Sequence, residues 1–223
     1  MTNFNYLSFS ECKNHDEYLI NNGYSMELLI NLAGKLLSKW ISTNIRTKKI
    51  IGIIGQGNNG KDVISMFNSL SQNYKCYTYC VDKTVKNTTE YKNLKTTKDI
   101  VELKHLDDVP TDGVIFDGIY GTGLNRKLSQ NIQRIISMLN NMKNTIISID
   151  VPSGLTESKT ETCIKADVTL TMMFPKKIFL NPKKRKVCGK IFIMNFKLSK
   201  LHLGPYQFPK TDADYIQLNE VNN

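Results

Sequence analysis

A short apolar run that ends in a glycine turn constrains this chain more than any other stretch. Residues 49–54 are rich in Ile and predict one buried strand. The turn has the spacing Gly55-x-Gly57-x-x-Gly60, and apolar side chains then recur at helical spacing. Strand, glycine turn and helix form the unit that presents backbone N–H groups to a phosphate at a helix N-terminus. The stretch therefore predicts an α/β fold with a nucleotide site, although a turn that only joins a strand to a helix has the same pattern.

Two amides in the turn and an acid at the end of the next strand sharpen this prediction. Asn58 and Asn59 place carbonyl oxygens and N–H donors beside the glycines. Such a pair suits a hard cation, or a ligand with both phosphate and amide groups. Asp82 closes a second candidate strand, residues 75–82, close to the position where a dinucleotide-binding fold has an acid for a ribose.

The periodicity of the remaining chain places the other elements. Ser25 is an N-cap residue for a helix that should end near Asn44. Further strands are expected at residues 113–116, 145–149, 167–173 and 190–196, with a helix before the second of these that turns Ile132, Ile135, Ile136 and Leu139 inward. Residues 1–22 predict polar, irregular structure, residues 83–99 lack a clear period, residues 100–106 fit a strand or a short helix, and the chain from Pro209 onward predicts a loosely attached tail.

Length and composition bound the domain count and the partners. A chain of 223 residues, 40% hydrophobic and 22% charged, fits one globular domain, residues 1–223, with a core at about residues 20–200. The formal net charge of +10 favours anionic partners such as nucleotides or nucleic acid. Much of this charge lies in a basic run from Lys176 to Lys190, where a solvated loop is a simpler interpretation than a nucleic-acid patch.

Cysteines and apolar runs indicate the compartment. The five cysteines have no metal-binding spacing and are odd in number, so we expect reduced thiols in a reducing compartment. No apolar run is long enough to cross a membrane, and the N-terminus lacks a secretion signal and is poor in Arg. We therefore expect the cytoplasm ahead of the mitochondrion, and no membrane association.

Three predicted strands end in polar side chains that suit a ligand. Asn58 and Asn59 follow the first strand, Asp117 follows the third, and Asp150 with Ser153 follows residues 145–149. Because the carboxyl ends of parallel strands meet at one edge of a sheet, these side chains should share a site. One such acid would be unremarkable, since Asp also caps helices. Three such loops with flanking glycines favour a ligand site.

Four segments of the chain resemble the motifs of one known family. They are an N-terminal helix signature from Gly23 to Gly34, a Gly-Asn-Asn-Gly-Gly-Asp-Gly loop at residues 55–62, an Asp-x-x-Phe-Gly turn at 117–123, and an Ile/Val-Asp-Ile/Val-Pro-Ser-Gly motif at 148–154. They occur in the family's order and span roughly residues 20–200. The chain thus resembles the NAD(P)H-hydrate epimerases, the YjeF N-terminal domain family, which is apolipoprotein A-I-binding protein-like.

The resemblance implies a fold and an activity. The fold would be a Rossmann-like three-layer α/β/α sandwich with a mostly parallel central sheet. The activity would be that of an isomerase in metabolite repair, which interconverts the R and S forms of hydrated NADH and NADPH (NADHX and NADPHX). A separate ATP- or ADP-dependent dehydratase would then restore the S form, and the family likeness also implies a homodimer.

The same resemblance assigns roles to residues that match the motifs. One potassium ion per subunit would bind Asn59, Asp117 and Ser153, and Asp150 would be the catalytic residue. The substrate-binding residues would be Asn58, Asn59, Gly60, Lys61, Asp62, Gly121, Thr122, Gly123, Leu124, Asn125, Arg126, Lys127 and Asp150.

The chemistry of this reaction suits a carboxylate at Asp150. The lone pair of the ring nitrogen can help to expel the hydroxyl, and water can then add to the other face, so the reaction needs no redox cofactor. One acid/base group that donates a proton and takes one back would serve this route. Asp150 is the candidate because no His or Cys lies in the matched loops. The backbone from Gly57 to Gly60 would take the pyrophosphate.

One loop departs from the family pattern. Where the family has Gly-Gly-Asp-Gly, this chain has Gly60, Lys61, Asp62 and Val63. The Lys61 side chain adds a charge that could reach a phosphate, but it also adds bulk where the backbone should approach the ligand closely. Val63 removes a glycine at the start of the helix. A domain that binds nucleotide with poor turnover is therefore one alternative.

Two other functions stay open at this point. An RNA- or protein-binding scaffold, similar to the C-terminal domain of mRNA-decapping scaffold proteins, is favoured by the basic run and the altered loop. The intact Asp117, Asp150 and Ser153 oppose it, and steeply salt-dependent RNA binding would support it. An NAD(P)-dependent oxidoreductase is suggested by the glycine spacing and Asp82. The chain has little room for a substrate domain, however, and no predicted active-site loop holds a His or a Tyr–Lys pair.

Overall fold

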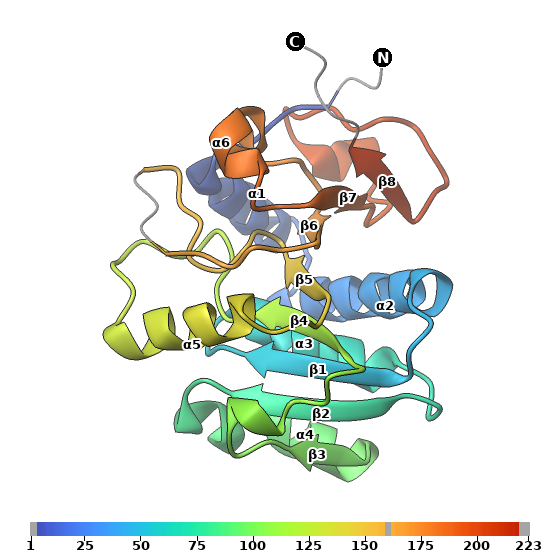
Figure 1. Ribbon diagram of the computed structural model, residues 1–223. Helices are drawn as coiled ribbons and strands as arrows, with labels where there is room; N and C mark the ends of the chain where they lie inside the picture. The colour runs from blue at the N-terminus through green and yellow to red at the C-terminus, as the bar shows by residue number, and fades with distance from the viewer. Residues whose placement is uncertain (1–3, 159–161, 219–223) are drawn as a thin grey trace.

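The computed structural model describes residues 4–158 and 162–218, which form one mostly parallel sheet with helices on both faces (Figure 1). Its strands are β1 (Lys49–Ile54), β2 (Lys75–Cys80), β3 (Ile100–Glu102), β4 (Val114–Gly118), β5 (Ile146–Ile149), β6 (Val168–Met172), β7 (Lys190–Met194) and β8 (Tyr215–Leu218). The α-helices are α1 (Phe9–Asn21), α2 (Met26–Asn44), α3 (Asn58–Ser69), α4 (Thr89–Thr97), α5 (Gln130–Asn140) and α6 (Pro182–Arg185). Short 3₁₀ helices are η1 (Lys83–Asn87), η2 (Leu106–Asp108), η3 (Lys177–Leu180) and η4 (Lys200–Leu203).

The strands lie in the order β3-β2-β1-β4-β5-β6-β7-β8, and only the pairing of β7 with β8 is antiparallel among these strands. The chain therefore runs outward from β1 in one direction and then from β4 in the other. In such sheets a ligand binds where the order reverses, at the carboxyl ends of the strands. Here that place is the crest above β1, β4 and β5, where the sequence predicts the ligand site.

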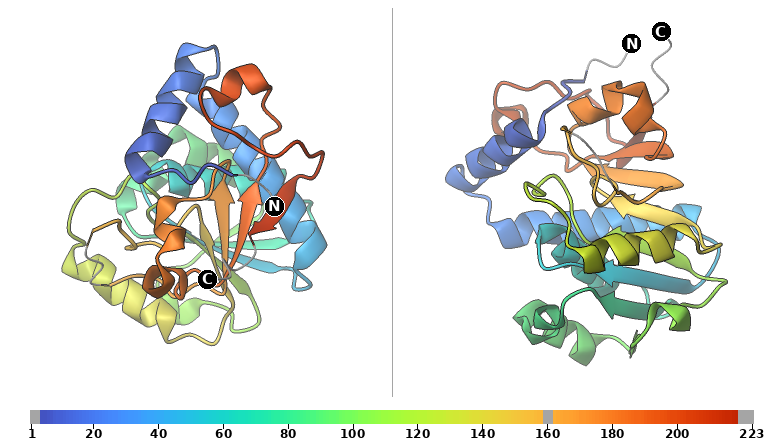
Figure 2. Two further views of the ribbon diagram at one scale, coloured as in Figure 1. Left: turned by 90° about the horizontal axis from the view of Figure 1, so that it is seen from above. Right: turned by 60° about the vertical axis from the view of Figure 1, so that its left-hand side comes forward.

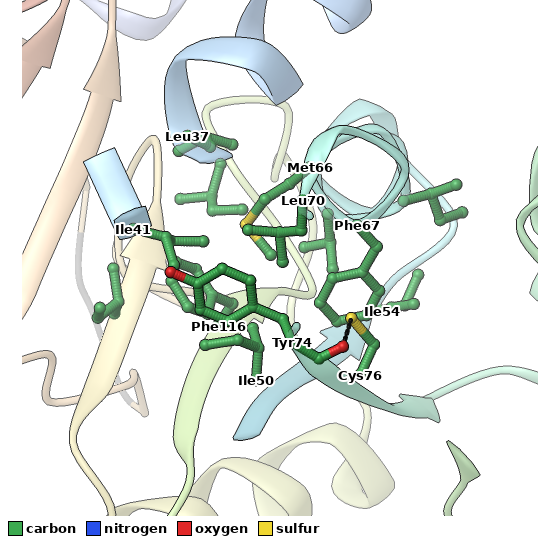
Figure 3. Close-up of a cluster of buried hydrophobic side chains, with 14 of the residues drawn as sticks. Leu37, Ile41, Ile50, Ile54, Met66, Phe67, Leu70, Tyr74, Cys76 and Phe116 are labelled. Atoms are coloured by element: carbon green, nitrogen blue, oxygen red, sulfur yellow. Dashed lines mark hydrogen bonds between the residues drawn. The ribbon is translucent and has the colours of Figure 1, made fainter. Parts of the chain in front are cut away.

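Two apolar layers cover the sheet and confirm the expected three-layer, Rossmann-like architecture. One face packs against α2, α3 and α4 through a cluster that includes Tyr91 of α4 as well as Leu37 and Phe67, which are labelled in Figure 3. The other face packs against α5 and η2 through a cluster that includes Ile135 and Leu106. The view from above in Figure 2 shows the strands between the blue helices α1 and α2 and the yellow helix α5. The Ile-rich run forms β1, which is buried from Ile50 to Ile54 as a central strand must be.

The prediction of irregular structure for residues 1–22 is wrong over residues 9–21, which form α1; residues 1–3 lie outside the described part of the chain. The helix begins after Ser8, whose side chain accepts a hydrogen bond from the Glu11 backbone N–H, while the Glu11 carboxylate accepts one from the Ser8 N–H at 2.6 Å. This capping box starts a helix that is largely polar. Its few buried residues include His15 and Leu19, and Leu19 packs with Phe174 beyond the end of β6. A helix with so narrow an apolar stripe has no strong signal in the sequence.

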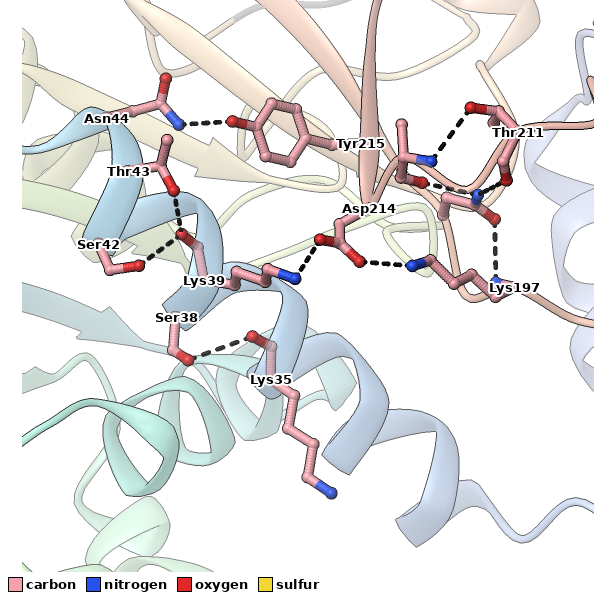
Figure 4. Close-up of polar contacts among 12 residues, drawn as sticks. Lys35, Ser38, Lys39, Ser42, Thr43, Asn44, Lys197, Thr211, Asp214 and Tyr215 are labelled. Carbon is pink, nitrogen blue, oxygen red and sulfur yellow. Dashed lines mark hydrogen bonds and ion pairs between the residues drawn. The ribbon is translucent and has the colours of Figure 1, made fainter.

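The prediction of a loose tail after Pro209 is also wrong over residues 215–218, which form β8; residues 219–223 lie outside the described part of the chain. Polar contacts hold the segment before β8 against α2 and β7 (Figure 4). Asp214 forms ion pairs with Lys39 of α2 and with Lys197. The Asn44 side-chain amide donates to the Tyr215 hydroxyl at 3.2 Å. The apolar signal of β8 is only four residues long, so the sequence favours a tail over a strand.

Among the described residues, no helix combines the length and the hydropathy that crossing a bilayer would require.

Candidate functional site

A cavity of about 1340 Å³ opens at the crest of the sheet. Its volume exceeds the 300–1,000 Å³ typical of small-molecule pockets and leaves room for a dinucleotide. Loops after β1, β4 and β5 line it together with α1 and the segment after β6. Of the residues expected to bind substrate, it is lined by Asn58, Asn59, Asp62, Gly121, Thr122, Gly123, Leu124, Asn125, Arg126, Lys127 and Asp150.

Gly60 and Lys61 do not line this cavity. A Cβ on Gly60 would lie 2.0 Å from the Gly55 carbonyl oxygen, so this glycine allows the turn to close tightly upon itself. The Lys61 side chain points to α4, where its Nζ lies 2.7 Å from the Glu90 carboxylate. Lys61 therefore leaves the backbone face of the loop open to a ligand instead of adding bulk there.

Val63 fits the sheet in a way that the sequence does not reveal. This side chain is fully buried under the crest. A Cβ on Gly52 of β1 would lie 2.6 Å from Val63 Cγ1, and a Cβ on Gly118 of β4 would lie 2.4 Å from Val63 Cγ2. Two glycines in the sheet thus provide the space for the branched side chain. The departure from the family loop is accommodated by packing beneath the site, away from the cavity.

Asp117 and Ser153 lie together beneath the floor of the cavity, both fully buried. Asp117 Oδ1 lies 2.5 Å from the Ser153 hydroxyl, which in turn accepts a hydrogen bond from the Tyr120 backbone N–H at 2.9 Å. Asp117 Oδ2 accepts hydrogen bonds from the Ser148 hydroxyl at 2.7 Å and from the Ser153 backbone N–H at 2.9 Å. This network links the ends of β4 and β5.

Burial raises the pKa of Asp117 above its ordinary value in spite of these hydrogen bonds, which act in the opposite direction. No lysine, arginine or histidine in the described part of the chain forms an ion pair with it. The ionised form of this carboxyl group would therefore gain from a bound cation.

Asn59 joins the same crest from the first turn of α3. Its side-chain amide donates to the Ile149 carbonyl oxygen at 3.0 Å, across the end of β4 to the end of β5. The loop after β4 passes close by, because a Cβ on Gly121 would lie 3.0 Å from Asn59 Oδ1 and 3.2 Å from Asp150 Oδ2. Asn59 is buried, with 7% of its surface exposed. No donor among the described residues contacts its Oδ1 atom.

The donor set of Asn59, Asp117 and Ser153 fits a hard, oxygen-loving cation. Three oxygen ligands occur at one crest: the Asn59 amide oxygen, which has no donor among the described residues, the Asp117 carboxylate, which has no basic partner among them, and the Ser153 hydroxyl. The described residues contain no cluster of three or more His, Cys, Asp or Glu that would suit a transition metal. The residues present therefore suit an alkali cation better than a transition metal.

Asp150 follows β5 and has an unusual backbone conformation. Its φ of 65° lies in the left-handed region, which few non-glycine residues adopt and which typically costs about 1–3 kcal/mol. Its backbone N–H bonds to the Leu170 carbonyl oxygen at 2.8 Å, which holds this conformation in place. The side chain thereby turns into the cavity, where Asp150 Oδ2 accepts a long hydrogen bond of 3.4 Å from the Thr122 N–H.

Lys176 is the charge partner of Asp150. Its ammonium nitrogen lies 2.6 Å from Asp150 Oδ1 and donates to the carbonyl oxygens of Met172 at 2.9 Å and Phe174 at 3.1 Å. Burial alone would raise the pKa of Asp150, but the charge and hydrogen bond of Lys176 outweigh it and lower that pKa below its ordinary value. The same pairing raises the pKa of Lys176 although burial opposes it. Asp150 is thus held as a carboxylate beside the cavity.

Sequence reasoning missed Lys176 by assigning it to the solvent-exposed basic run. The side chain is only 3% exposed, and it comes four residues after the end of β6, where it reaches Asp150. That position after a strand end is the signal that could have identified it. Two other cations of the run also have protein partners: Lys177 pairs with Glu11, and Lys184 donates to three carbonyl oxygens of residues 156–158. The run is therefore not one continuous strip of free charge for RNA.

The sequence also missed the wall that α1 contributes to the cavity. Cys12 and Asp16 of this helix line it, as does Gly57 of the glycine turn. Desolvation by the surrounding groups, and then the negative charge of Asp150, raise the pKa of Asp16 to about 6, although this side chain is exposed to solvent.

Asp82, the expected ribose acid, lies outside this cavity, in a smaller pocket that also includes Gln56 and Arg126. Its carboxylate caps η1 by accepting from the Thr84 N–H at 2.8 Å.

Relatives of known name resemble the chain over most of its length. A family model described as YjeF-related protein N-terminus matches residues 26–178. The NAD(P)H-hydrate epimerase of Oenococcus oeni is 26% identical over 198 residues, which cover 84% of this chain and 94% of that protein. The NAD(P)H-hydrate epimerase of Plasmodium knowlesi is 26% identical over 232 residues, which cover 96% of this chain and 78% of that protein.

Two further matches concern a fused relative and the fold. The bifunctional NAD(P)H-hydrate repair enzyme Nnr of Dictyoglomus turgidum is 32% identical over 145 residues, which cover 60% of this chain but 28% of that protein. The crystal structure of the yeast protein YNL200c superimposes with a TM-score of 0.76 at 17% identity, covering 96% of this chain and all of that chain. At this identity the likeness concerns the fold alone.

Proposed function

The chain belongs to the family of YjeF-related N-terminal domains, and we propose from this that it is an NAD(P)H-hydrate epimerase, an isomerase of metabolite repair. Its substrates would be the R and S forms of NADHX and NADPHX. The observation that carries the proposal is a buried Asp150 carboxylate, paired with Lys176, in a cavity large enough for a dinucleotide. The expected loops after β1, β4 and β5 all contribute to that cavity.

Asp150 would donate a proton to the leaving hydroxyl and take one back from the attacking water, beside the reacting ring carbon. The hydroxyl leaves with help from the ring nitrogen lone pair, and water then adds to the opposite face of the resulting iminium ion. A carboxylate near this carbon stabilises the positive charge and can take a proton from the attacking water. The ion pair with Lys176 keeps Asp150 in the ionised form that this step requires.

The rest of the cavity would bind the nucleotide. Backbone N–H groups at the start of α3, where Gly57 provides no side-chain cap, would bind the pyrophosphate. Asn58, Asn59 and Asp62 form one wall, and the loop from Gly121 to Lys127 forms another with its two cations, Arg126 and Lys127. These cations favour the phosphates of a dinucleotide over a neutral ligand. Gly60 would contribute through the turn it allows, and Lys61 through its pair with Glu90.

A potassium ion would complete the site. Asn59, Asp117 and Ser153 would hold it, since each offers an oxygen at the crest. When bound, the ion would supply the positive charge that the buried Asp117 lacks and would fix the loops after β1, β4 and β5 relative to one another. The hydrogen bond between the Ser153 hydroxyl and the Asp117 carboxylate supports the proposal, because it brings two oxygen ligands next to each other.

The proposal extends to partners and location. The relative from Dictyoglomus turgidum is named a bifunctional repair enzyme, which supports cooperation with an ATP- or ADP-dependent dehydratase on a separate chain. All five cysteines are free thiols, which suits a reducing compartment such as the cytoplasm. A homodimer is proposed from the family likeness alone.

A coupled assay tests this function. A mixture of R and S NADHX is treated with a strictly S-specific dehydratase, with and without the protein. The proposal expects the R fraction to disappear faster when the protein is present, in proportion to its concentration. An R fraction that decays at the rate seen with the dehydratase alone would reject the proposal.

A further inference from the structure

Asp62 is a buried carboxyl group that has no partner in the part of the chain that the structure describes. It lies in the second turn of α3, lines the cavity and is 9% exposed. Within residues 4–158 and 162–218, no side chain or backbone group is found to donate a hydrogen bond or form an ion pair to its carboxylate. Buried carboxyl groups are nearly always partnered, because an unpartnered charge in the interior is costly. A group in this state suits a role with a ligand in the cavity.

The second carboxyl group of the cavity has the opposite environment. Asp150 enters from the end of β5 and is paired with the Lys176 ammonium at 2.6 Å. Asp62 enters from α3, which follows β1, so the two groups belong to different loops of the crest. The charged groups that face Asp62 are Asp150 itself and Asp16 of α1, both acidic. One carboxyl group therefore has a cation beside it, whereas the charged groups that act on the other, among the described residues, are both acids.

We propose that Asp62 is the proton donor to the leaving hydroxyl and that Asp150 is the base that accepts a proton from the attacking water. This assignment rests on the proposed epimerase function. It replaces a single acid/base group with two carboxyl groups that divide the work, one protonated and one ionised at the start.

Each step balances. The C–O bond of the epimer whose hydroxyl faces Asp62 breaks, the hydroxyl takes the Asp62 proton and leaves as water, and the nitrogen lone pair forms the C=N bond of an iminium ion. A water on the Asp150 side forms the new C–O bond, the C=N electrons return to nitrogen, and Asp150 takes the water proton. A proton then passes through solvent from Asp150 to Asp62. The reverse direction uses the same groups with one shared proton.

The electrostatics agree with this division. Burial, and then the negative charges of Asp150 and Asp16, raise the pKa of Asp62 well above its ordinary value, whereas Lys176 lowers the pKa of Asp150. Two carboxyl groups whose pKa values are pushed apart are the usual arrangement for an acid and a base in one site. The form with its one proton on Asp62 is ready to react with the epimer whose hydroxyl faces Asp62.

The experiment is the pH dependence of R-to-S interconversion in wild type, Asp62→Asn and Asp62→Glu, with Asp112→Asn as a control at an exposed acid paired with Lys49. We expect a bell-shaped profile in wild type and in the control. Asp62→Asn should lower kcat by about 100-fold or more and lose the alkaline limb, because its amide cannot donate a proton. Asp62→Glu should recover part of the rate and the limb.

The outcomes separate this inference from the function itself. Thermal melting of Asp62→Asn must match wild type, and kcat is compared at saturating substrate because Asp62 also lines the cavity, so that a lost rate reports chemistry and not unfolding or weaker binding. If wild type interconverts the epimers but Asp62→Asn retains the rate and the alkaline limb, the proton-donor role is overturned while the epimerase function stands. If Asp62→Asn does not fold, a rate for Asp62→Glu without an alkaline limb overturns the role in the same way. If wild type itself does not interconvert them, both fall.

Discussion

The Lys176 ammonium lies 2.6 Å from the Asp150 carboxylate, and both groups are buried at the edge of the cavity. The pair connects the segment after β6 to the end of β5. Desolvation of two charges is costly, and it is offset only when the geometry is good and the remaining protons are satisfied. Here the carbonyl oxygens of Met172 and Phe174 accept the other Lys176 protons. The arrangement keeps an ionised carboxylate in a place where a lone carboxyl group would be neutral.

Lys176→Met should destabilise the protein and disable Asp150. Removal of one partner leaves the other charge buried, which typically costs about 3–5 kcal/mol. The paired Asp150 has a lowered pKa, so it favours folding above the ordinary pKa range of Asp, and this contribution is lost as pH falls through the folded-state value. The melting-temperature gap between variant and wild type should therefore be widest at neutral pH and narrow in acid.

The neighbouring Lys177→Met is the matched control for this prediction. Lys177 pairs with Glu11 at the surface, with 50% of its side chain exposed, so we expect little change in melting or rate. In Lys176→Met, in contrast, the pKa of Asp150 should rise because its cationic partner is lost, so the acid limb of the pH–rate profile should move to higher pH. Equal effects of the two substitutions would show that the buried pair has no special role.

Asp150→Asn should remove interconversion while the chain still folds. Asn adopts the left-handed conformation at this position more readily than most residues, so the turn should persist. An amide cannot take a proton from water, and the loss should be about 100-fold or more in kcat. Circular dichroism and nucleotide binding would verify the fold and the cavity. Turnover at the wild-type rate would exclude Asp150 from the mechanism.

Potassium should raise both the melting temperature and the activity. Replacement of potassium by tetramethylammonium at constant ionic strength removes a cation that can enter the oxygen site, so the stabilisation by binding is lost. Asn59→Ala should respond less to potassium, because it removes an amide oxygen that has no donor among the described residues. If wild type melts at the same temperature and turns over at the same rate in both cations, the assignment of Asn59, Asp117 and Ser153 fails.

Two alanine substitutions in the glycine turn should separate folding from binding. A Cβ at position 60 would overlap the Gly55 carbonyl oxygen, whereas a Cβ at position 57 meets no atom within 4 Å and Gly57 has an ordinary φ of −81°. Gly60→Ala should therefore lower the melting temperature. Gly57→Ala should fold normally but raise KM, because its methyl group lies where the backbone should approach the phosphates. The reverse pattern would contradict the proposed path of the pyrophosphate.

The crest of the sheet was predictable because its residues are local signals. Glycine spacing after an Ile-rich strand and acids directly after apolar runs mark loops at the carboxyl edge of a parallel sheet. The helix from Ser25 to Asn44 was predictable for a similar reason, since its cap and its apolar stripe are both in the sequence, and the structure confirms it from Met26 to Asn44.

The missed features depend on contacts between distant segments. Lys176 has the sequence context of a surface lysine. Only the fold brings it to Asp150, which lies 26 residues earlier in the sequence. In α1, His15 is buried against Phe174 and Tyr206, aromatic rings from elsewhere in the chain. The four residues of β8 become a strand by pairing with β7. Local propensity cannot predict such elements, because tertiary packing decides them.

The most direct measurement starts from a single purified epimer of NADHX and follows the appearance of the other by chromatography, with no dehydratase present. The account predicts that R and S approach equilibrium faster than in buffer, at a rate proportional to protein concentration. Asp150→Asn should approach it at the buffer rate. If the wild-type protein leaves the spontaneous rate unchanged under conditions in which it is folded and supplied with potassium, the chain is not an epimerase.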